Sequence, residues 1–158
     1  MQSISIFRQL GLLCVVSTGL LFSSCSKNNN YTAPSTTYTI SASLTAAQEV
    51  PATNSTGTGT LTGTYDASTY KLSYTLNWSG LTGAATGMHF HGPAAAGTSA
   101  AVEVAITGFP SAASGTVSGT ATLTASQNDD LLGGKMYANI HTSANPAGEI
   151  RGQVSASK

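Results

Sequence analysis

The feature that most constrains the fold is an alternation of apolar and small polar residues, with a period of two, that begins at Tyr38. The clearest run places Leu72, Tyr74, Leu76 and Trp78 at every second position, with Ser, Thr and Asn between them. Such alternation is typical of a β-strand that has one face in a core and the other in water. Similar short runs follow, separated by Gly, Asn, Asp or Pro, which are frequent in turns. The pattern predicts an all-β domain.

The spacing of these runs indicates about eight strands in hairpin-like succession, which favours an antiparallel Greek-key sandwich or barrel over a parallel α/β sheet. The side chains expected to face inward, strand by strand, are Tyr38, Ile40, Ala42, Leu44, Leu61, Tyr65, Leu72, Tyr74, Leu76, Trp78, Met88, Phe90, Val102, Val104, Ile106, Val117, Ala121, Leu123, Met136, Ala138, Ile140, Ile150 and Val154. One helical turn is predicted over residues 125–132, with Ser126 as its N-cap and Gly133–Gly134 as its end.

Residues 1–24 have the pattern of an export signal, with Arg8 before an apolar stretch that is too short for a comfortable membrane span. The run from Leu21 to Cys25, Leu-Phe-Ser-Ser-Cys, resembles the lipobox of bacterial lipoproteins. That resemblance implies cleavage before Cys25 and acylation, by palmitate or a similar chain, of its thiol and new amino terminus. Phe22 departs from the commoner Leu, and an ordinary secretory signal or an uncleaved anchor is the alternative.

A lipidated chain is expected to reside in the cell envelope, held by its acyl chains to a bacterial membrane, with the domain extracytoplasmic and the outer membrane or cell surface favoured. Residues 25–37 contain few apolar side chains and are expected to form a flexible tether. The domain itself is expected over residues 38–156. Because Cys14 would leave with the signal and Cys25 would carry lipid, no thiol would remain for a disulfide or a metal.

The charge balance and the motifs that the sequence lacks argue against several classes of protein function. The six basic and six acidic residues balance, so no basic surface predicts a nucleic-acid partner. There is no phosphate loop and no nucleophile elbow, and Asp129–Asp130 lie in a polar, turn-like stretch that is more typical of a solvated cap than of a catalytic pair. The sequence therefore predicts no catalytic residue and leans away from an enzyme.

The chain has three histidines, and the strand pattern places all of them on polar faces. His89 and His91 point to one side of their strand, opposite Met88 and Phe90. In a second run, Tyr137, Asn139 and His141 share one face. Together these two runs predict a single polar site.

The first hypothesis for this site is a metal centre with His89, His91 and His141 as ligands to copper or zinc. Glu149, Asn139 or a backbone carbonyl would then accept the outer imidazole N–H, and Tyr137 would line the site.

The alternative is that the histidines brace the fold, together with Glu149 and Arg151 paired across two positions of the last strand. The domain would then be a non-metal adhesion or protein-binding module with an extracytoplasmic protein partner. At Glu49, the favoured interpretation is that Val50 packs inward and Pro51 ends an edge segment. The other interpretation is that Glu49 reaches the histidine cluster.

Three motifs occur in a recognisable order: Ala-Ala-Gln-Glu-Val-Pro at residues 46–51, Met-His-Phe-His-Gly-Pro at 88–93, and Tyr-Ala-Asn-Ile-His-Thr at 137–142 leading to Gly-Glu-Ile-Arg-Gly-Gln at 148–153. From about residue 38 to 154 the chain resembles the CHRD domain, named after chordin. The resemblance implies an immunoglobulin-like β-barrel with a limited likeness to copper/zinc superoxide dismutases, in a family whose biochemical function is largely unassigned. Three histidines are too few for the two metal sites of those dismutases, so that activity is not expected. No residue here supports the growth-factor antagonism of chordin.

Overall fold

The computed structural model of the chain describes residues 35–158. The predicted signal segment, Cys25 and most of the predicted tether lie outside the described residues. Within the described part, no helix is both long and apolar enough to cross a membrane.

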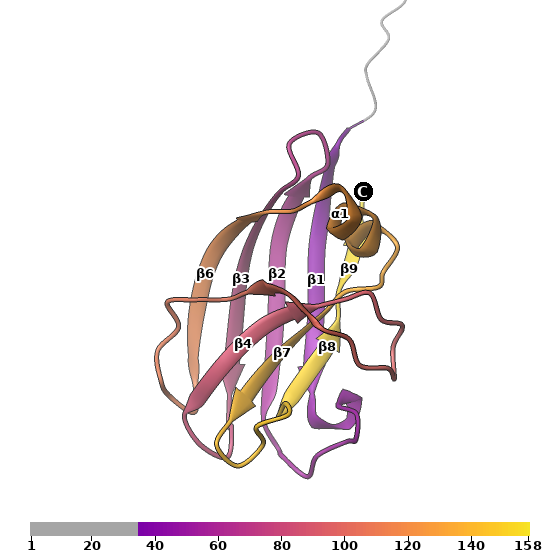
Figure 1. Cartoon of the computed structure of the whole chain (residues 1–158). Helices are drawn as coiled ribbons and strands as arrows, with labels where there is room; N and C mark the ends of the chain where they lie inside the picture. The colour runs from indigo at the N-terminus through magenta and orange to yellow at the C-terminus, as the bar shows by residue number, and fades with distance from the viewer. Residues whose placement is uncertain (1–34) are drawn as a thin grey trace, which may run out of the picture. The chain divides into compact units, whose positions relative to one another are not determined.

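Nine strands and two short helices make up the described chain (Figure 1). The strands are β1 (Thr37–Thr45), β2 (Thr58–Asp66), β3 (Lys71–Ser79), β4 (Ala85–His91), β5 (Val102–Ala105), β6 (Gly115–Thr122), β7 (Tyr137–Thr142), β8 (Ile150–Gln153) and β9 (Ser155–Ser157). The helices are the 3-10 turn η1 (Ala46–Gln48) and the α-helix α1 (Ala125–Leu132).

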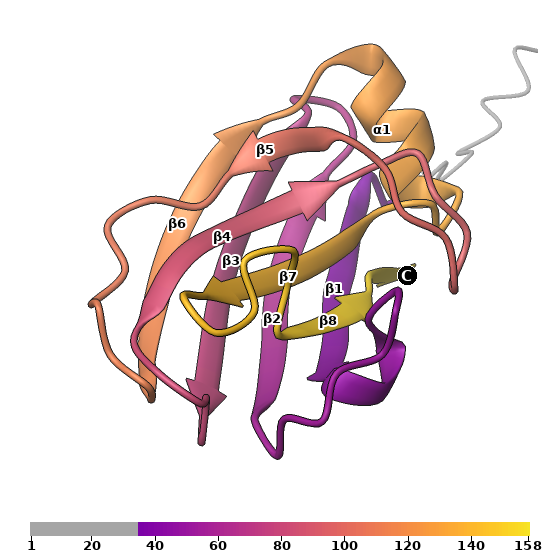
Figure 2. The same cartoon turned by 60° about the horizontal axis from the view of Figure 1, so that its bottom comes forward.

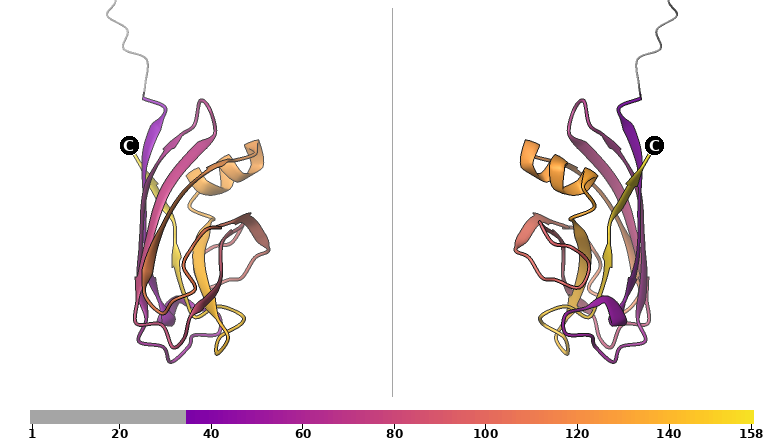
Figure 3. Two further views of the ribbon diagram at one scale, coloured as in Figure 1. Left: turned by 90° about the vertical axis from the view of Figure 1, so that its left-hand side faces the viewer. Right: turned by 90° about the vertical axis from the view of Figure 1, so that its right-hand side faces the viewer.

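The strands form one antiparallel sheet in the order β5-β4-β7-β8-β1-β2-β3-β6, with β9 pairing additionally with β1. The sheet folds over, so that β1, β2, β3 and β6 make one layer and β4, β5, β7 and β8 make the other (Figures 1 and 2). The side views in Figure 3 show the two layers facing each other. The result is a nearly closed, barrel-like sandwich, which confirms the predicted all-β class.

The last two strands join the layers along one side. β8 pairs with β7 in one layer, whereas β9, two residues further on, pairs with β1 in the other. Between them Val154 is buried, and its N–H donates to the Met136 carbonyl. The chain therefore changes layer without leaving the hydrogen-bonded sheet.

The core lies between the layers and consists mainly of the predicted alternate residues. Ile40, Leu72, Leu76, Met88 and Phe90 are fully buried, because each stands at an inward position of a strand whose other face meets solvent or loops. The exception is Val102, which is 50% exposed. It lies on β5, a four-residue strand at the edge of the sheet.

The predicted helix is confirmed over Ala125–Leu132, but the predicted cap is wrong. Thr124 is the N-cap: its hydroxyl accepts from the Gln127 N–H, and the Gln127 side chain accepts from the Thr124 N–H. This reciprocal capping box satisfies two backbone donors. Ser126 lies inside the first turn of the helix and therefore does not cap it. Gly133 follows the helix as its C-cap.

Candidate functional site

All three histidines lie on the face of β4 and β7 that points away from the core. The register sets Gly87 of β4 opposite His141 of β7, and His89 opposite Asn139. His91 is opposite Tyr137. The two polar runs of the sequence therefore meet on adjacent strands, and one nitrogen from each histidine lies within 4.8 Å of the others.

His89 and His141 form the tightest pair in this cluster. His89 Nδ1 lies 3.1 Å from His141 Nε2. The other nitrogen of His141, Nδ1, lies 3.0 Å from the Pro146 carbonyl oxygen, to which it donates. That contact fixes the tautomer of His141, so its Nε2 lone pair faces His89.

His91 is held separately. Its Nδ1 lies 3.0 Å from the Ala100 carbonyl oxygen and its Nε2 lies 3.0 Å from Asn139 Oδ1. A neutral imidazole has one N–H, so the ring is either protonated or paired with an Asn139 amide turned to donate its Nδ2 hydrogen. The His91 ring also stacks on Tyr137, with centroids 4.8 Å apart and planes 2° apart.

The electrostatics of the pair favour neutral imidazoles. Burial lowers the pKa of His89, and the neighbouring His141 and His91 lower it further. Burial also lowers the pKa of His141, against the hydrogen bond to the Pro146 carbonyl, which raises it. Both rings therefore stay neutral, with one unprotonated nitrogen each, to a lower pH than an ordinary histidine does.

The distances between the histidine nitrogens determine whether one ion could contact all three rings. Nitrogens that each lie about 2.0–2.1 Å from the same ion are at most about 4.2 Å apart. The 3.1 Å pair meets this limit and would subtend an angle of roughly 100° at an ion with those bond lengths. The outermost separation in the set, up to 4.8 Å, is slightly too long. A third bond would therefore require the rings to move closer together, and His91 would have to give up its contact with either the Ala100 carbonyl or Asn139.

Gly87 keeps the outer side of the pair open. A Cβ at this position would lie 3.3 Å from His89 Cε1 and 3.5 Å from His141 Cδ2. A larger side chain would press on both rings. The sequence pattern predicts no role for Gly87, because the position of Gly87 next to the two histidine rings depends on the register of β4 against β7.

Of the other predicted site residues, two lie at the cluster and two do not contact it directly. Asn139 contacts His91, and Tyr137 stacks on it. Arg151 lies beyond Tyr137, with its guanidinium carbon 4.6 Å from the tyrosine ring centre. Glu149 has its hydrogen-bond partners elsewhere.

Glu149 is fully buried in a cage of donors. Its carboxylate accepts from Ser55 Oγ at 2.6 Å, from the N–H and hydroxyl of Thr82 at 2.7 Å each, from Thr142 Oγ1 at 2.5 Å and from Asn145 Nδ2 at 3.2 Å. Burial alone would raise its pKa, but these hydrogen bonds outweigh burial and hold the pKa at about 2. The predicted Glu149–Arg151 pair is therefore wrong, since neutral donors occupy the carboxylate.

The acidic partner of Arg151 is Glu49. The side chain of Arg151 is 4% exposed and that of Glu49 is 6% exposed, and Glu49 Oε2 lies 3.9 Å from Arg151 Nε. Val50, by contrast, is 42% exposed. The favoured prediction for this segment, with Val50 inward, is wrong: after η1 the chain turns so that Glu49 faces Arg151 on β8.

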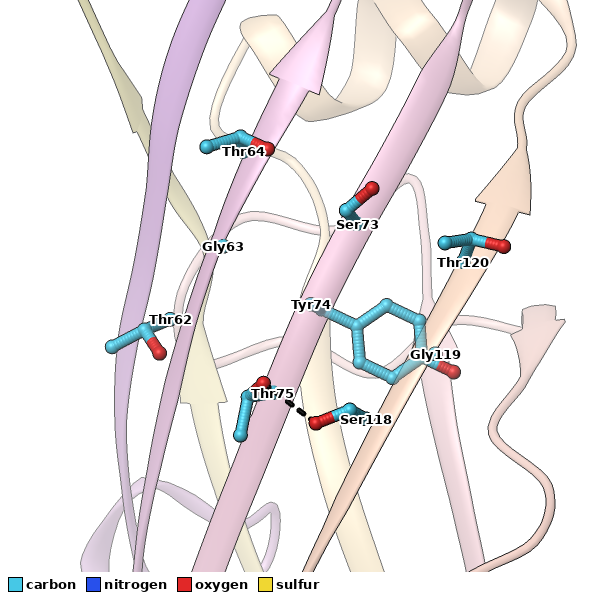
Figure 4. A pocket seen from close by; sticks show the side chains of 9 residues that line it. All are labelled: Thr62, Gly63, Thr64, Ser73, Tyr74, Thr75, Ser118, Gly119 and Thr120. Carbon is cyan, nitrogen blue, oxygen red and sulfur yellow. Dashed lines mark hydrogen bonds between the residues drawn. The ribbon is translucent and has the colours of Figure 1, made fainter.

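A separate groove of about 580 Å³ lies on the opposite layer, across β2, β3 and β6 (Figure 4). Its lining consists of Thr62, Gly63, Thr64, Ser73, Tyr74, Thr75, Ser118, Gly119 and Thr120. No histidine, carboxylate or basic side chain lines it, so it offers no metal ligand of the kind found on β4 and β7.

Comparison with known proteins agrees with the order of the three motifs. The sequence model of the CHRD domain matches residues 40–154. The chain belongs to the CHRD domain family. No curated protein and no solved structure matches it significantly.

The matched range places every described feature of the site inside the CHRD domain. It begins in β1 and ends after β8, so it contains the histidine cluster, the Glu149 cage and the Glu49–Arg151 pair. Each of the three motifs supplies a part: the first carries Glu49, the second His89 and His91, and the third His141 with Glu149 and Arg151 following.

Proposed function

We propose that this CHRD domain binds one Cu(II) or Zn(II) ion through His89 and His141, with His91 as the third ligand. The observation that carries the proposal is the 3.1 Å approach of His89 Nδ1 to His141 Nε2, with the His141 ring oriented by the Pro146 carbonyl. Ligating histidines are commonly oriented in this way by an acceptor at their other nitrogen.

The donor set favours these two ions. All three donors are imidazole nitrogens, and borderline ions such as Cu(II) and Zn(II) prefer them over the hard oxygen ligands that Ca²⁺ and Mg²⁺ require. The open side at Gly87 would leave room for water or another small ligand on the ion.

The decisive experiment is calorimetric titration of the metal-stripped full chain, in mild detergent at about pH 7.5, with Cu(II) and with Zn(II). One ion should bind per chain, and His89→Ala and His141→Ala should each weaken binding by orders of magnitude. His91→Ala should cost less, since His91 must move to reach the ion. Asn77→Ala, on the exposed face of the other layer, is the matched control and should bind as the natural chain does.

Unchanged binding in His89→Ala and His141→Ala would contradict the proposal, as would affinity no higher than that of an unrelated histidine-containing protein. The histidines would then be bracing residues, and His141→Ala would lower stability without any dependence on metal.

We also propose that the chain is a lipoprotein of the bacterial cell envelope, anchored through acylated Cys25 with its domain extracytoplasmic. The support is the sequence from Leu21 to Cys25. Labelled palmitate should be incorporated into the natural chain and into Cys14→Ala, but not into Cys25→Ala. Cys25→Ala should also leave the membrane fraction. Equal labelling of both variants would refute acylation at Cys25.

A further inference from the structure

β6 is the last strand at one end of the sheet, and within the described chain no strand pairs with its outer edge (Figure 1). The strand is eight residues long and contains neither a charged residue nor a proline. Its pairing with β3 is continuous, so no bulge turns the edge away. Proteins usually block a long free edge with charges, prolines, bulges or a covering element, because such an edge readily pairs with another chain.

The strand at the opposite end of the sheet is protected. β5 has only four residues and carries the charged side chain of Glu103. From α1, the side chain of Gln127 donates to the Glu103 carbonyl and so occupies a backbone acceptor of β5. No comparable contact protects β6 in the described chain: residues 106–114, which lead into it, hydrogen-bond to residues 78–88 and not to β6.

The alternation of hydrogen bonds between β3 and β6 identifies the backbone groups at the free edge. The Leu123 N–H, just after β6, donates to the Tyr70 carbonyl, just before β3. In an antiparallel pair, bonded residues alternate with residues whose N–H and C=O point away from the partner strand. Every second residue of β6 therefore directs both groups to the outer edge, and its side chain is exposed. These residues are Thr116, Ser118, Thr120 and Thr122.

We propose that β6 pairs with β6 of a second copy of this chain, antiparallel about a two-fold axis. An interface of this kind is self-complementary, because the same surface is used on both copies. Only the register centred on Gly119 uses all of the outward residues: Thr116 pairs with Thr122 of the second copy, and Ser118 pairs with Thr120. Each pair exchanges two backbone hydrogen bonds. The two β1-β2-β3-β6 layers then become one continuous sheet.

The centre of this register favours a second copy as the partner. Gly119 has no side chain, and the Tyr74 ring lies across it, with Tyr74 Oη 2.5 Å from the place that a Cβ would take (Figure 4). The Tyr74 hydroxyl, whose pKa is raised by burial alone, makes no hydrogen bond within the described chain. At the two-fold axis the hydroxyls of the two copies come together, and each can donate to or accept from the other.

The charges of this layer also permit the pairing. Lys71 of β3 lies beside Thr122 of β6, and Asn77 lies beside Thr116. Because Thr122 faces Thr116 of the second copy, each Lys71 has Asn77 of the second copy at the far end of its row. The two lysines therefore lie far apart in the joined sheet, and no like charges meet at the interface.

Sedimentation equilibrium of the metal-stripped full chain, in density-matched mild detergent, tests the pairing. Metal is removed so that an ion at the histidines cannot join two copies, which separates this proposal from the metal proposal. The chain should dimerise reversibly. A chain that stays monomeric up to about 1 mM would overturn the proposal.

Charged substitutions at the edge test which surface is used. Ser118→Lys combined with Thr120→Lys sets lysines directly opposite each other in the dimer, and Ser118→Glu with Thr120→Glu does the same with carboxylates. Each double variant alone should dimerise at least about tenfold more weakly, whereas an equimolar mixture of the two should recover dimerisation as a heterodimer.

Thr60→Lys combined with Thr62→Lys is the matched control, because both side chains are exposed on β2 of the same layer but away from the edge. This control should dimerise as the natural chain does, and circular dichroism should show that all variants keep the β-fold. Unchanged dimerisation of the edge variants, a mixture that does not recover, or equal weakening in the control would each overturn the pairing of β6 with itself.

Discussion

Replacement of Glu149 by glutamine tests the most strongly supported polar interaction in the domain. The carboxylate accepts five hydrogen bonds that join the segments around Ser55, Thr82, Thr142 and Asn145. Glutamine has nearly the same shape but no charge, and its amide nitrogen would face at least one of these donors. The change therefore removes charge-assisted hydrogen bonds and leaves a buried donor unpaired.

The magnitude follows from the pKa. A carboxyl group whose pKa falls from 4.5 in the unfolded chain to about 2 in the folded protein stabilises the fold by about 3 kcal/mol once it is ionised in both states. Because the folded pKa is the lower one, this contribution is complete above pH 4.5. It is lost as the pH falls from 4.5 toward 2.

Urea unfolding of the natural chain and of Glu149→Gln at pH 7 and near pH 3 measures both quantities. We expect the variant to lose about 3 kcal/mol at pH 7 and roughly half as much near pH 3, where the natural carboxylate has lost part of its advantage. Asp66→Asn is the control: its pKa is also held at about 2, mainly by hydrogen bonds from Ser68, but it lies at an exposed hairpin end and its replacement should cost less. A loss below about 1 kcal/mol at pH 7, or the same loss at both pH values, would refute the reasoning.

Three further predictions concern the helix, the sheet and the histidines. Thr124→Ala should lower the free energy of unfolding by about 1 kcal/mol through loss of the N-cap, whereas Ser126→Ala should change it by less than about 0.5 kcal/mol; equal effects in urea unfolding would contradict the cap assignment. Gly119→Ala should cost about 1–3 kcal/mol, because its Cβ would lie 2.5 Å from Tyr74 Oη, and Tyr74→Phe in the same chain should recover part of the loss; no recovery in the double variant would place the strain elsewhere. In metal-free protein, NMR titration of the two paired histidines should give midpoints below the ordinary 6.5. Since the folded pKa values are the lower ones, stability should fall as the pH drops below 6.5, and midpoints above 6.5 would contradict the burial argument.

The strands, most of the inward rows and the helix follow from local patterns. Alternation over a few residues decides which face of a strand is apolar, whatever its neighbours are, so Leu72 to Trp78 could be assigned without knowledge of the sheet. The capping box from Thr124 to Gln127 is also a local pattern, because the N-cap and its partner are three residues apart, so the correct cap is predictable from the sequence alone.

The polar interactions depend on contacts between distant parts of the chain. Glu149 lies 94 residues from Ser55 and 67 from Thr82, and Arg151 lies 103 residues from Gln48. The sequence placed His89, His91 and His141 on polar faces, but the antiparallel register of β4 and β7 determines that His89 and His141 meet and that Gly87 leaves their outer side open. Alternation is a property of each strand separately, whereas register and the partner of a buried charge arise only when the strands pack together.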